Sequence, residues 1–438
     1  MGHGVTRAGL VCATAFILTG CLSDMGGNGE GFVSRLMTTD HTKVGKPTHA
    51  EKVNAESVII QGLTARRSAL PDGSTFDQVA TSVLAAYSRA AEAELRAARL
   101  RSEAASKNWL PKIGPSISLT SLSSVVANLV VDQVLFDNGR LKGERAFAIA
   151  DVEVAAVSLA QDTNARVHSA LGLYTDAVEA REKAALAQTA LQDMGHFAWI
   201  MEERVKGGVS DLSEYNVMIQ KLDEIKAENR ANAEHAATSL AELNAMSIQP
   251  LDDLRGVPRF AVSPDAAQPL TVTLAEAEKT RAIAAAKVER ASNLPGLSAG
   301  GTVGEEATFG LQVKSEKLLG LGTGASLEAI EAASEAAGRR VSQANEDANR
   351  TLRKLEGQIA AKQRQSDEAA QLTIKAKENL RVFRAQFDAG QRQVLDVVGV
   401  YEIYARQQQA EVTLKYEAVR MRLEMAELLG VLADGDAI

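Results

Sequence analysis

Cys21 is the side chain whose sequence context most directly predicts a chemical reaction. It follows the tripeptide Leu-Thr-Gly, which ends a mostly apolar run at 8–18, and Arg7 precedes that run. The run is too short to cross a bilayer as a helix, so residues 1–20 have the pattern of a cleaved secretion signal. The four residues ending at Cys21 resemble a bacterial lipobox, in which the cysteine thiol is acylated after cleavage. The alternative is an ordinary signal peptide in which Cys21 is incidental.

Lipidation would place the mature chain at a membrane, since two acyl chains make a stable anchor. Leu22 follows the cysteine, as in lipoproteins sorted to the outer membrane of many Gram-negative bacteria. The only other cysteine, Cys12, would leave with the signal. The mature protein would then have no free thiol for a disulfide, a metal site or a nucleophile.

Other residues that could do chemistry are not spaced for it. The histidines are scattered, with no His-x₃-His pair, and they are His3, His41, His49, His168, His196 and His235. No glycine-rich phosphate loop in a strand context occurs, and no catalytic set of acid, base and nucleophile is apparent, so we expect no enzyme, no metal and no cofactor. The net charge is −8, with lysine and arginine interspersed among acids, which gives no sign of nucleic-acid binding.

A glycine followed six residues later by a carboxylate stands at two places about half the chain length apart. The first case runs from Gly208 to Glu214, and the second runs from Gly390 to Asp396, about 182 residues later. The Asn-Trp-Leu-Pro at 108–111 also reappears as Ser-Asn-Leu-Pro, about 184 residues later. Two matches at nearly half the chain length predict an internal duplication.

Each repeat is expected to run helix, Leu-Pro break, two short strands, very long helix, glycine tip and returning helix. The expected organisation begins with a signal peptide at 1–20 and a lipid-anchored tether at 21–74, which has one short helix near 55–67. The first repeat is expected at 75–248, with strands near 113–136 and a tip at 207–208, and a linker follows at 249–270. The second repeat is expected at 271–432, with strands near 297–318 and a tip at 389–391, and a tail follows at 433–438. Four short strands are too few to close a barrel, so this architecture suggests partners.

The helices are expected to be long and narrow. The first long helix, from 140 to about 206, would measure on the order of 100 Å. Aromatic residues make up only 4% of the chain, which favours close helix packing over a thick core. The segment 76–107 has no Gly or Pro and is expected to be one helix. The last helix has a near-heptad seam at Val394, Val398, Tyr401, Ala405, Gln408, Val412, Tyr416, Val419, Leu423 and Ala426.

These features together resemble the TolC family of outer membrane factors over about 75–432. The strongest match is the decapeptide Phe-Asp-Ala-Gly-Gln-Arg-Gln-Val-Leu-Asp at 387–396, and Val-Leu-Phe-Asp-Asn-Gly-Arg at 134–140 resembles the strand-to-helix turn. The resemblance implies a fold that is mainly α with a small β part. Duplicated coiled-coil hairpins would form an α-barrel. Each subunit of a homotrimer would give four strands to a twelve-stranded barrel in outer membrane lipid.

The resemblance also implies roles for particular residues. Gly207, Gly208 and Gly390 would form the hairpin tips on which a periplasmic adaptor and an inner-membrane transporter dock. The alternative is that these glycines only allow the chain to turn in a loop and have no role in docking. Glu214, Arg392, Asp396 and Phe387 would lie at the periplasmic entrance gate. Asp396 could instead be a favourable charge at a helix N-terminus.

The sequence departs from the family pattern at the expected gate. Phe387 stands where some members have Tyr, and Gly399 stands where some have a second Asp. The expected function is an exit duct that passively conducts small molecules or unfolded polypeptide. The alternative is a structural periplasmic coiled-coil lipoprotein without channel activity.

Overall fold

The computed structural model describes residues 57–435 except 88–89, 122–123, 305–306 and 316–319. These residues all belong to one unit, and Cys21 and the segment 1–20, expected to be a signal peptide, lie outside them. In chain order the elements are α3 (Val58–Thr64), α4 (Thr75–Ala85), α5 (Ala90–Ser106), β1 (Lys112–Ser121), β2 (Ser124–Phe136), α6 (Arg140–Lys206), α7 (Leu212–Ala245), α8 (Leu270–Ser292), β3 (Gly296–Val303), β4 (Thr308–Lys314), α9 (Thr323–Asp388) and α10 (Val394–Leu429).

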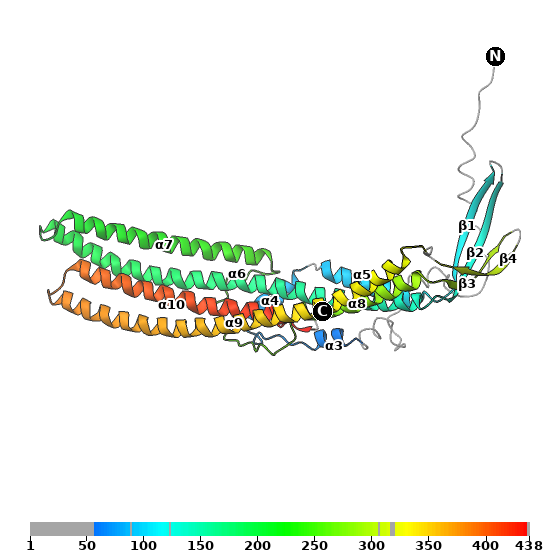
Figure 1. The fold of residues 1–438 in the computed structure, drawn as a ribbon. Helices are drawn as coiled ribbons and strands as arrows, with labels where there is room; N and C mark the ends of the chain where they lie inside the picture. The colour runs from blue at the N-terminus through cyan, green and yellow to red at the C-terminus, as the bar shows by residue number, and fades with distance from the viewer. Residues whose placement is uncertain (1–56, 88–89, 122–123, 305–306, 316–319, 436–438) are drawn as a thin grey trace, which may run out of the picture. The chain divides into compact units, whose positions relative to one another are not determined.

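The duplication is visible in the lengths of the long helices. Helices α6 and α9 have 67 and 66 residues, and the returning helices α7 and α10 have 34 and 36. Helix α6 lies beside α7, and α9 lies beside α10, so each repeat forms a helical hairpin (Figure 1). None of the described helices is both long enough and apolar enough to span a membrane.

Both long helices start just after a strand pair, and the start of α6 is set by an Asp-Asn-Gly turn. Asn138 and Gly139 take positive φ angles of 56° and 87°, which short polar side chains and glycine tolerate. The Asp137 carboxylate accepts the backbone N–H groups of Gly139 and Leu141 at 3.0 and 2.6 Å. The carboxylate therefore satisfies otherwise unpaired donors at the helix N-terminus.

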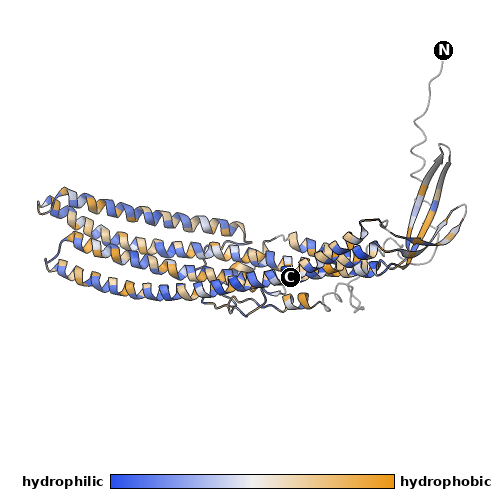
Figure 2. Ribbon diagram, viewed as in Figure 1, coloured by the Kyte–Doolittle hydropathy of each residue, from blue (hydrophilic) through white to orange (hydrophobic). Residues whose placement is uncertain are grey.

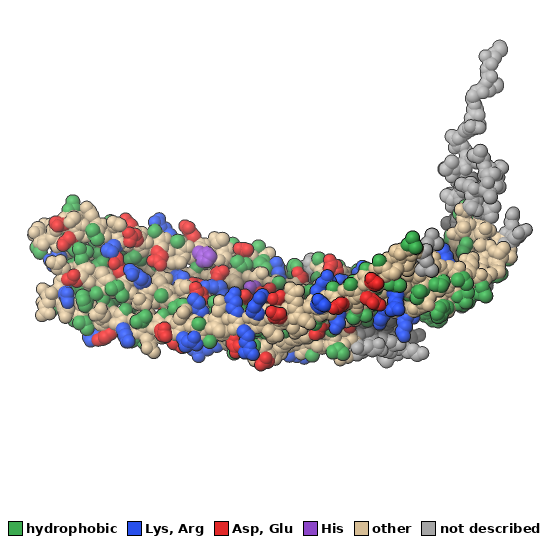
Figure 3. All heavy atoms as spheres, viewed as in Figure 1, with side chains coloured by type: hydrophobic (Ala, Val, Ile, Leu, Met, Phe, Trp, Pro, Cys, Tyr) green, Lys and Arg blue, Asp and Glu red, His purple; other side chains and the backbone are tan. Residues whose placement is uncertain are grey.

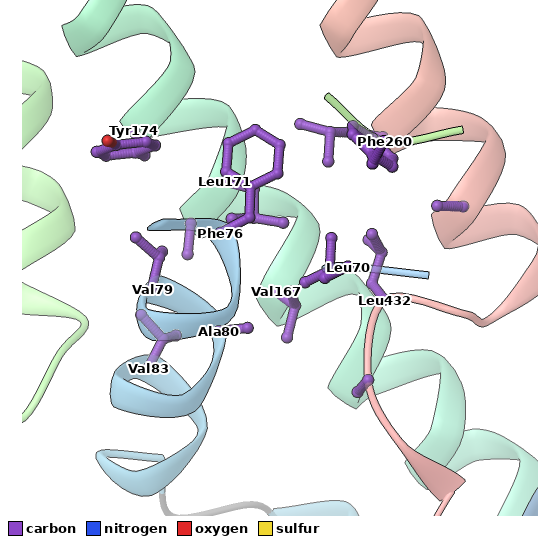
Figure 4. Close-up of a cluster of buried hydrophobic side chains, with 14 of the residues drawn as sticks. Leu70, Phe76, Val79, Ala80, Val83, Val167, Leu171, Tyr174, Phe260 and Leu432 are labelled. Atoms are coloured by element: carbon purple, nitrogen blue, oxygen red, sulfur yellow. The ribbon is translucent and has the colours of Figure 1, made fainter. Parts of the chain in front are cut away.

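The helices pack through narrow seams of apolar residues, which alternate with polar residues along each helix (Figure 2). The largest buried cluster joins α4, α6, α10 and the loop after α7. Phe76 is fully buried there, with its ring edge-on to Tyr174 at 6.1 Å and to Phe260 at 5.7 Å (Figure 4). The linker between the repeats therefore contributes to the core.

The seam expected on the last helix is confirmed. Seven of its ten positions are buried and three are half-buried, and the half-buried ones are Ala405, Gln408 and Val419. Because α10 packs against both α9 and α6, its seam holds the two hairpins together.

The described part of 57–74, where a tether with one short helix near 55–67 was expected, contains helix α3 and packs against the rest of the chain. Ile60 and Leu63 of α3 are buried, and so is Leu70 after it. The Ala69 N–H donates to the Val431 carbonyl at 2.7 Å, so this segment is bonded to the chain just after α10. These contacts join residues more than 350 positions apart, which a local pattern does not reveal.

The single helix expected at 76–107 is instead two helices, α4 and α5. Beyond the end of α4, the Tyr87 hydroxyl donates to the Asp162 carboxylate at 3.2 Å, and the Arg166 guanidinium lies 4.7 Å from the Tyr87 ring centre. Both partners are on α6. This non-local contact accompanies the break, although the sequence there lacks Gly and Pro.

The strands form one antiparallel sheet in the order β1-β2-β3-β4. The central pair, β2 and β3, joins the first repeat to the second. The sheet therefore links the two repeats at the end opposite the hairpin tips (Figure 1).

Candidate functional site

The two hairpin tips have the same backbone geometry. At the first, Gly208 has a φ of 72°, and the Val209 N–H donates to the Arg204 carbonyl at 2.9 Å. At the second, Gly390 has a φ of 74°, and the Gln391 N–H donates to a carbonyl five residues earlier at 2.8 Å. This six-residue ring is the Schellman helix end, which requires a left-handed residue and so favours glycine.

Gly207 differs from the other two tip glycines. Its φ is −79°, within the ordinary helical range, so the backbone does not require glycine there. Beyond this residue the first tip exposes two large apolar side chains, Val209 at 67% and Leu212 at 62%. The sequence analysis did not single out either residue, although apolar side chains beside a turn are a signal of a contact surface.

The residues expected at the entrance gate lie at or near the two tips. Within the described residues no hydrogen bond or ion pair joins Glu214 to Arg392 or Asp396. Arg392 is exposed, lies 4.6 Å from the Phe383 ring centre and donates to the Gln386 side chain at 3.1 Å.

The two acidic residues have different local surroundings. Asp396 accepts the Gln393 backbone N–H at 3.3 Å and completes a capping box at the start of α10. Glu214 occupies the same place in α7, but the cap there is Asp211, which accepts the Glu214 N–H at 3.0 Å. Hydrogen bonds from the Ser213 hydroxyl and the Glu214 N–H lower the pKa of Asp211. Asp211 was absent from the sequence-based site.

Phe387 is half-buried and packs edge-on against Phe197 of α6 at 6.2 Å. Behind it, Arg384 of α9 pairs with Asp193 of α6 at 3.1 Å. The same guanidinium lies 5.6 Å from the ring centres of Phe197 and Tyr401. Burial, followed by the charge of Asp193 and a hydrogen bond to it, raises the pKa of Tyr401. This cluster connects α6, α9 and α10 behind the tips.

The sheet at the other end has one apolar face. The register places Ile113 opposite Val131, and Leu129 opposite Val303. It continues on β4 with Phe309, Leu311 and Val313, which are 76%, 70% and 75% exposed. Hydrophobic side chains gather at this end of the face shown in Figure 3. A monomer leaves this apolar face uncovered.

The opposite face of the same sheet carries most of its polar side chains, together with Val130 and Val134. Residues directly opposite in an antiparallel pair share a face. Its polar members are Lys112, Ser116, Asn128, Asp132, Ser298, Thr302, Thr308, Gln312 and Lys314. A β-bulge between Val134 and Phe136 brings Phe136 opposite Leu297, which returns an aromatic side chain to the apolar face. The bulge explains why the alternation in the sequence is imperfect.

The sheet has two unpaired edges, since β1 and β4 each have one partner among the described strands. An unpaired edge offers a row of free N–H and C=O groups to another chain. In the described part of the chain, no three His, Cys, Asp or Glu side chains form a group that could hold a metal ion.

Comparison with known proteins gives matches in structure and not in sequence. No protein-family model matches the chain, and no curated protein does. A membrane protein from Pseudomonas aeruginosa matches with a TM-score of 0.72 and 15% identity over 87% of this chain and 94% of that one. The open state of the MtrE outer membrane channel from Neisseria gonorrhoeae matches with a TM-score of 0.67 and 15% identity over 85% and 95%.

The CmeC outer membrane channel of Campylobacter jejuni is also similar, with a TM-score of 0.63 and 14% identity over 82% of this chain and 86% of that one. These matches span most of both chains. The chain therefore has the fold of these outer membrane channels, and the expected fold, mainly α with a small antiparallel sheet, is confirmed.

Proposed function

We propose that this chain is one subunit of a trimeric outer membrane channel that passively conducts cargo out of the periplasm. The observation that carries the proposal is the sheet, which has one apolar and one polar face. In a bilayer, an apolar face suits lipid and a polar face suits a water-filled interior. The solved channels that share the fold support the same function.

Closure of the sheet requires more than one copy. Backbone groups in lipid must all be hydrogen-bonded, so a sheet with two open edges is not stable there. Pairing β4 of one subunit with β1 of the next removes every edge. Three copies of the four strands give the twelve-stranded barrel expected from the resemblance.

The hairpins would form the periplasmic part of the channel. Helices α6 and α9 are each on the order of 100 Å long, long enough for a tunnel reaching far from the membrane. We propose that a periplasmic adaptor and an inner-membrane transporter dock on the tips. Gly208 and Gly390 keep the tips compact, and exposed Val209 and Leu212 offer apolar contact area.

The entrance would lie between the tips of the three subunits. In this proposal Glu214 and Asp396 supply negative charge there, repeated by the threefold symmetry, and favour cations. Arg392 and Phe387 would line the same entrance. Acylated Cys21 would anchor the mature chain to the outer membrane beside the sheet. Small molecules and unfolded polypeptides are both suitable cargo for such a passage.

The second candidate is a structural periplasmic lipoprotein built on the same coiled-coil hairpins. The long helices alone fit it equally well. A structural lipoprotein does not require an exposed apolar sheet face, whereas the Phe309, Leu311 and Val313 side chains on this face are each 70% or more exposed.

The test is single-channel conductance of the detergent-purified mature protein in planar bilayers, with the oligomer mass measured alongside. We expect a trimer that inserts and conducts. A protein that is released into water after removal of its lipid and never conducts would instead be the structural lipoprotein.

A further inference from the structure

The sheet carries only three charged residues, and all of them lie on its polar face. They are Lys112 at the start of β1, Asp132 on β2 and Lys314 at the end of β4. Lys112 is directly opposite Asp132, and Lys314 is directly opposite Gly296, the first residue of β3. Both lysines therefore lie where the strands meet the helices. The strands therefore carry more positive than negative charge, although the whole chain has a net charge of −8.

These three side chains line one cavity of about 230 Å³ at the helix-side end of the sheet. Asp137 and Arg140 line it too, and the charge of each is partly compensated by its own local partners. Asp137 accepts backbone N–H groups at the start of α6, and Arg140 pairs with Glu144 at 2.6 Å. Within the described residues neither lysine has an ion pair, and Asp132 is not within ion-pair distance of Lys112.

The two lysines also lie on the two unpaired strands. Lys112 belongs to the edge strand β1 and Lys314 to the edge strand β4. The register sets Lys112 level with Gly310, through Asp132 and Gly300, so β4 extends four residues further toward the helices. Tilted strands in a closed barrel require such a stagger. In a closed sheet the helix-side ends of β4 and the next β1 therefore meet at each subunit junction.

We infer that Lys112 and Lys314 form a basic collar inside the channel, which favours anions and binds cargo bearing carboxylate or phosphate groups. This inference rests on the proposed trimeric channel. The strands of each subunit contribute two lysines against the one carboxylate of Asp132, and the charge of Asp137 beside them is partly offset by the N-terminus of α6. Rings of lysine or arginine select for anions in pores. The rest of the polar face is uncharged, so nothing else in the strands offsets the collar.

The collar is tested by the reversal potential of the mature protein in planar bilayers under a KCl gradient. The double variant K112Q/K314Q should shift the permeability ratio several-fold toward K⁺ relative to the wild type. The matched control K112R/K314R keeps both charges and should retain the wild-type reversal potential. An unchanged potential in the glutamine variant of a conducting trimer overturns the collar and leaves the channel proposal standing.

A second measurement applies if the double variant K112Q/K314Q does not assemble into trimers. Inorganic tripolyphosphate added to the wild type should reduce its conductance, and the single variants K112Q and K314Q should each need several-fold more of it for half block. Equal block in wild type and single variants overturns the collar. A wild-type trimer that never conducts overturns the proposed function, and the collar with it.

Discussion

At the scale of single residues, Asp396 combines two roles that one substitution can separate. Its carboxylate accepts a backbone N–H at the start of α10, and in the proposed channel it also supplies charge at the entrance. Asp396→Asn keeps an acceptor oxygen and removes the charge. We expect this variant to shift the reversal potential toward anions with little change in the thermal unfolding midpoint.

Asp396→Ala is the companion variant, since it removes both the charge and the cap. It should show the same shift in selectivity together with a lower unfolding midpoint. If the asparagine variant leaves selectivity unchanged, Asp396 serves the helix alone and the entrance charge lies elsewhere.

For Gly390 the question is whether the glycine is needed for folding of the tip or for docking of a partner. Its φ is 74°, and a Cβ there would meet nothing within 4 Å, so any cost of substitution is backbone strain. Gly390→Ala should destabilise the tip by roughly 1–2 kcal/mol. Gly390→Asn places a side chain at the tip that tolerates the left-handed conformation. We expect the asparagine variant to form normal trimers and to lose export in cells.

Trimer mass and export are the two readouts for that pair. Loss of trimers in the asparagine variant would mean that the glycine serves folding. Normal export by the asparagine variant would place the docking contact away from the tip, and Val209 and Leu212 would be tested next.

At the scale of helices, a half-buried carboxylate couples the packing of α6 and α10 to pH. Burial raises the pKa of Glu427, the charge of His168 opposes this, and the charge of Glu424 adds to it. The Glu427 carboxylate lies 3.1 Å from the Nδ1 atom of His168. A raised folded pKa favours the protonated form, so its contribution is present below the unfolded pKa and is lost as pH rises through the folded pKa.

In the wild type the contribution of Glu427 to the free energy of unfolding should decrease from about pH 4.3, the pKa of glutamate in an unfolded chain, to neutral pH. Glu427→Gln should reduce this decrease, because glutamine does not titrate. The group is half-exposed, so we expect an effect of about 1 kcal/mol at most. The measurement is the urea midpoint of the detergent-solubilised protein across that pH range. A variant whose pH profile matches the wild type would show that the ion pair with His168 offsets burial completely.

The helices and tips were predictable because their signals are local. The Asp-Asn-Gly turn, the tip glycines and the heptad seam each act within a few residues, and α6 begins and ends within the expected 140–206. The packing of Leu70 was not predictable from local pattern, since it depends on residues near 431. A place for Asp396 at a helix N-terminus was one of the two expectations, whereas the cap at Asp211 was recognised only from the observed start of α7.

The two faces of the sheet were only partly predictable. Ser116 and Ile117 alternate in β1, but the bulge before Phe136 interrupts the period in β2, and β3 has glycines at 296, 300 and 301. A side chain at Gly301 would meet the Phe309 ring at 2.4 Å, so this glycine makes room for an aromatic neighbour. Which residues share a face follows from register, and register is a property of strand pairing.

At the scale of the whole molecule, the two faces of β4 provide a matched pair of substitutions. Phe309 belongs to the apolar face and Gln312 to the polar face. Phe309→Lys would put a charge against lipid at a cost of about 2–4 kcal/mol per subunit near the midplane. We expect it to abolish membrane insertion, whereas Gln312→Lys should still insert as a trimer.

Insertion is measured by recovery of folded trimers in outer membrane fractions. Equal recovery of both variants would mean that the apolar face does not meet lipid. Loss of only the Gln312 variant would mean that the face assignments are reversed.

The open edges of β1 and β4 have a consequence for how much protein a cell must make. Since each sheet is completed only by other copies, the stability of the closed form depends on subunit concentration as well as on contacts within one chain. Below a threshold level of synthesis, newly exported chains would remain single and carry an uncovered apolar face through the periplasm, exposed to proteases. Gene dosage would therefore determine the number of channels steeply, and halving expression would remove more than half of them.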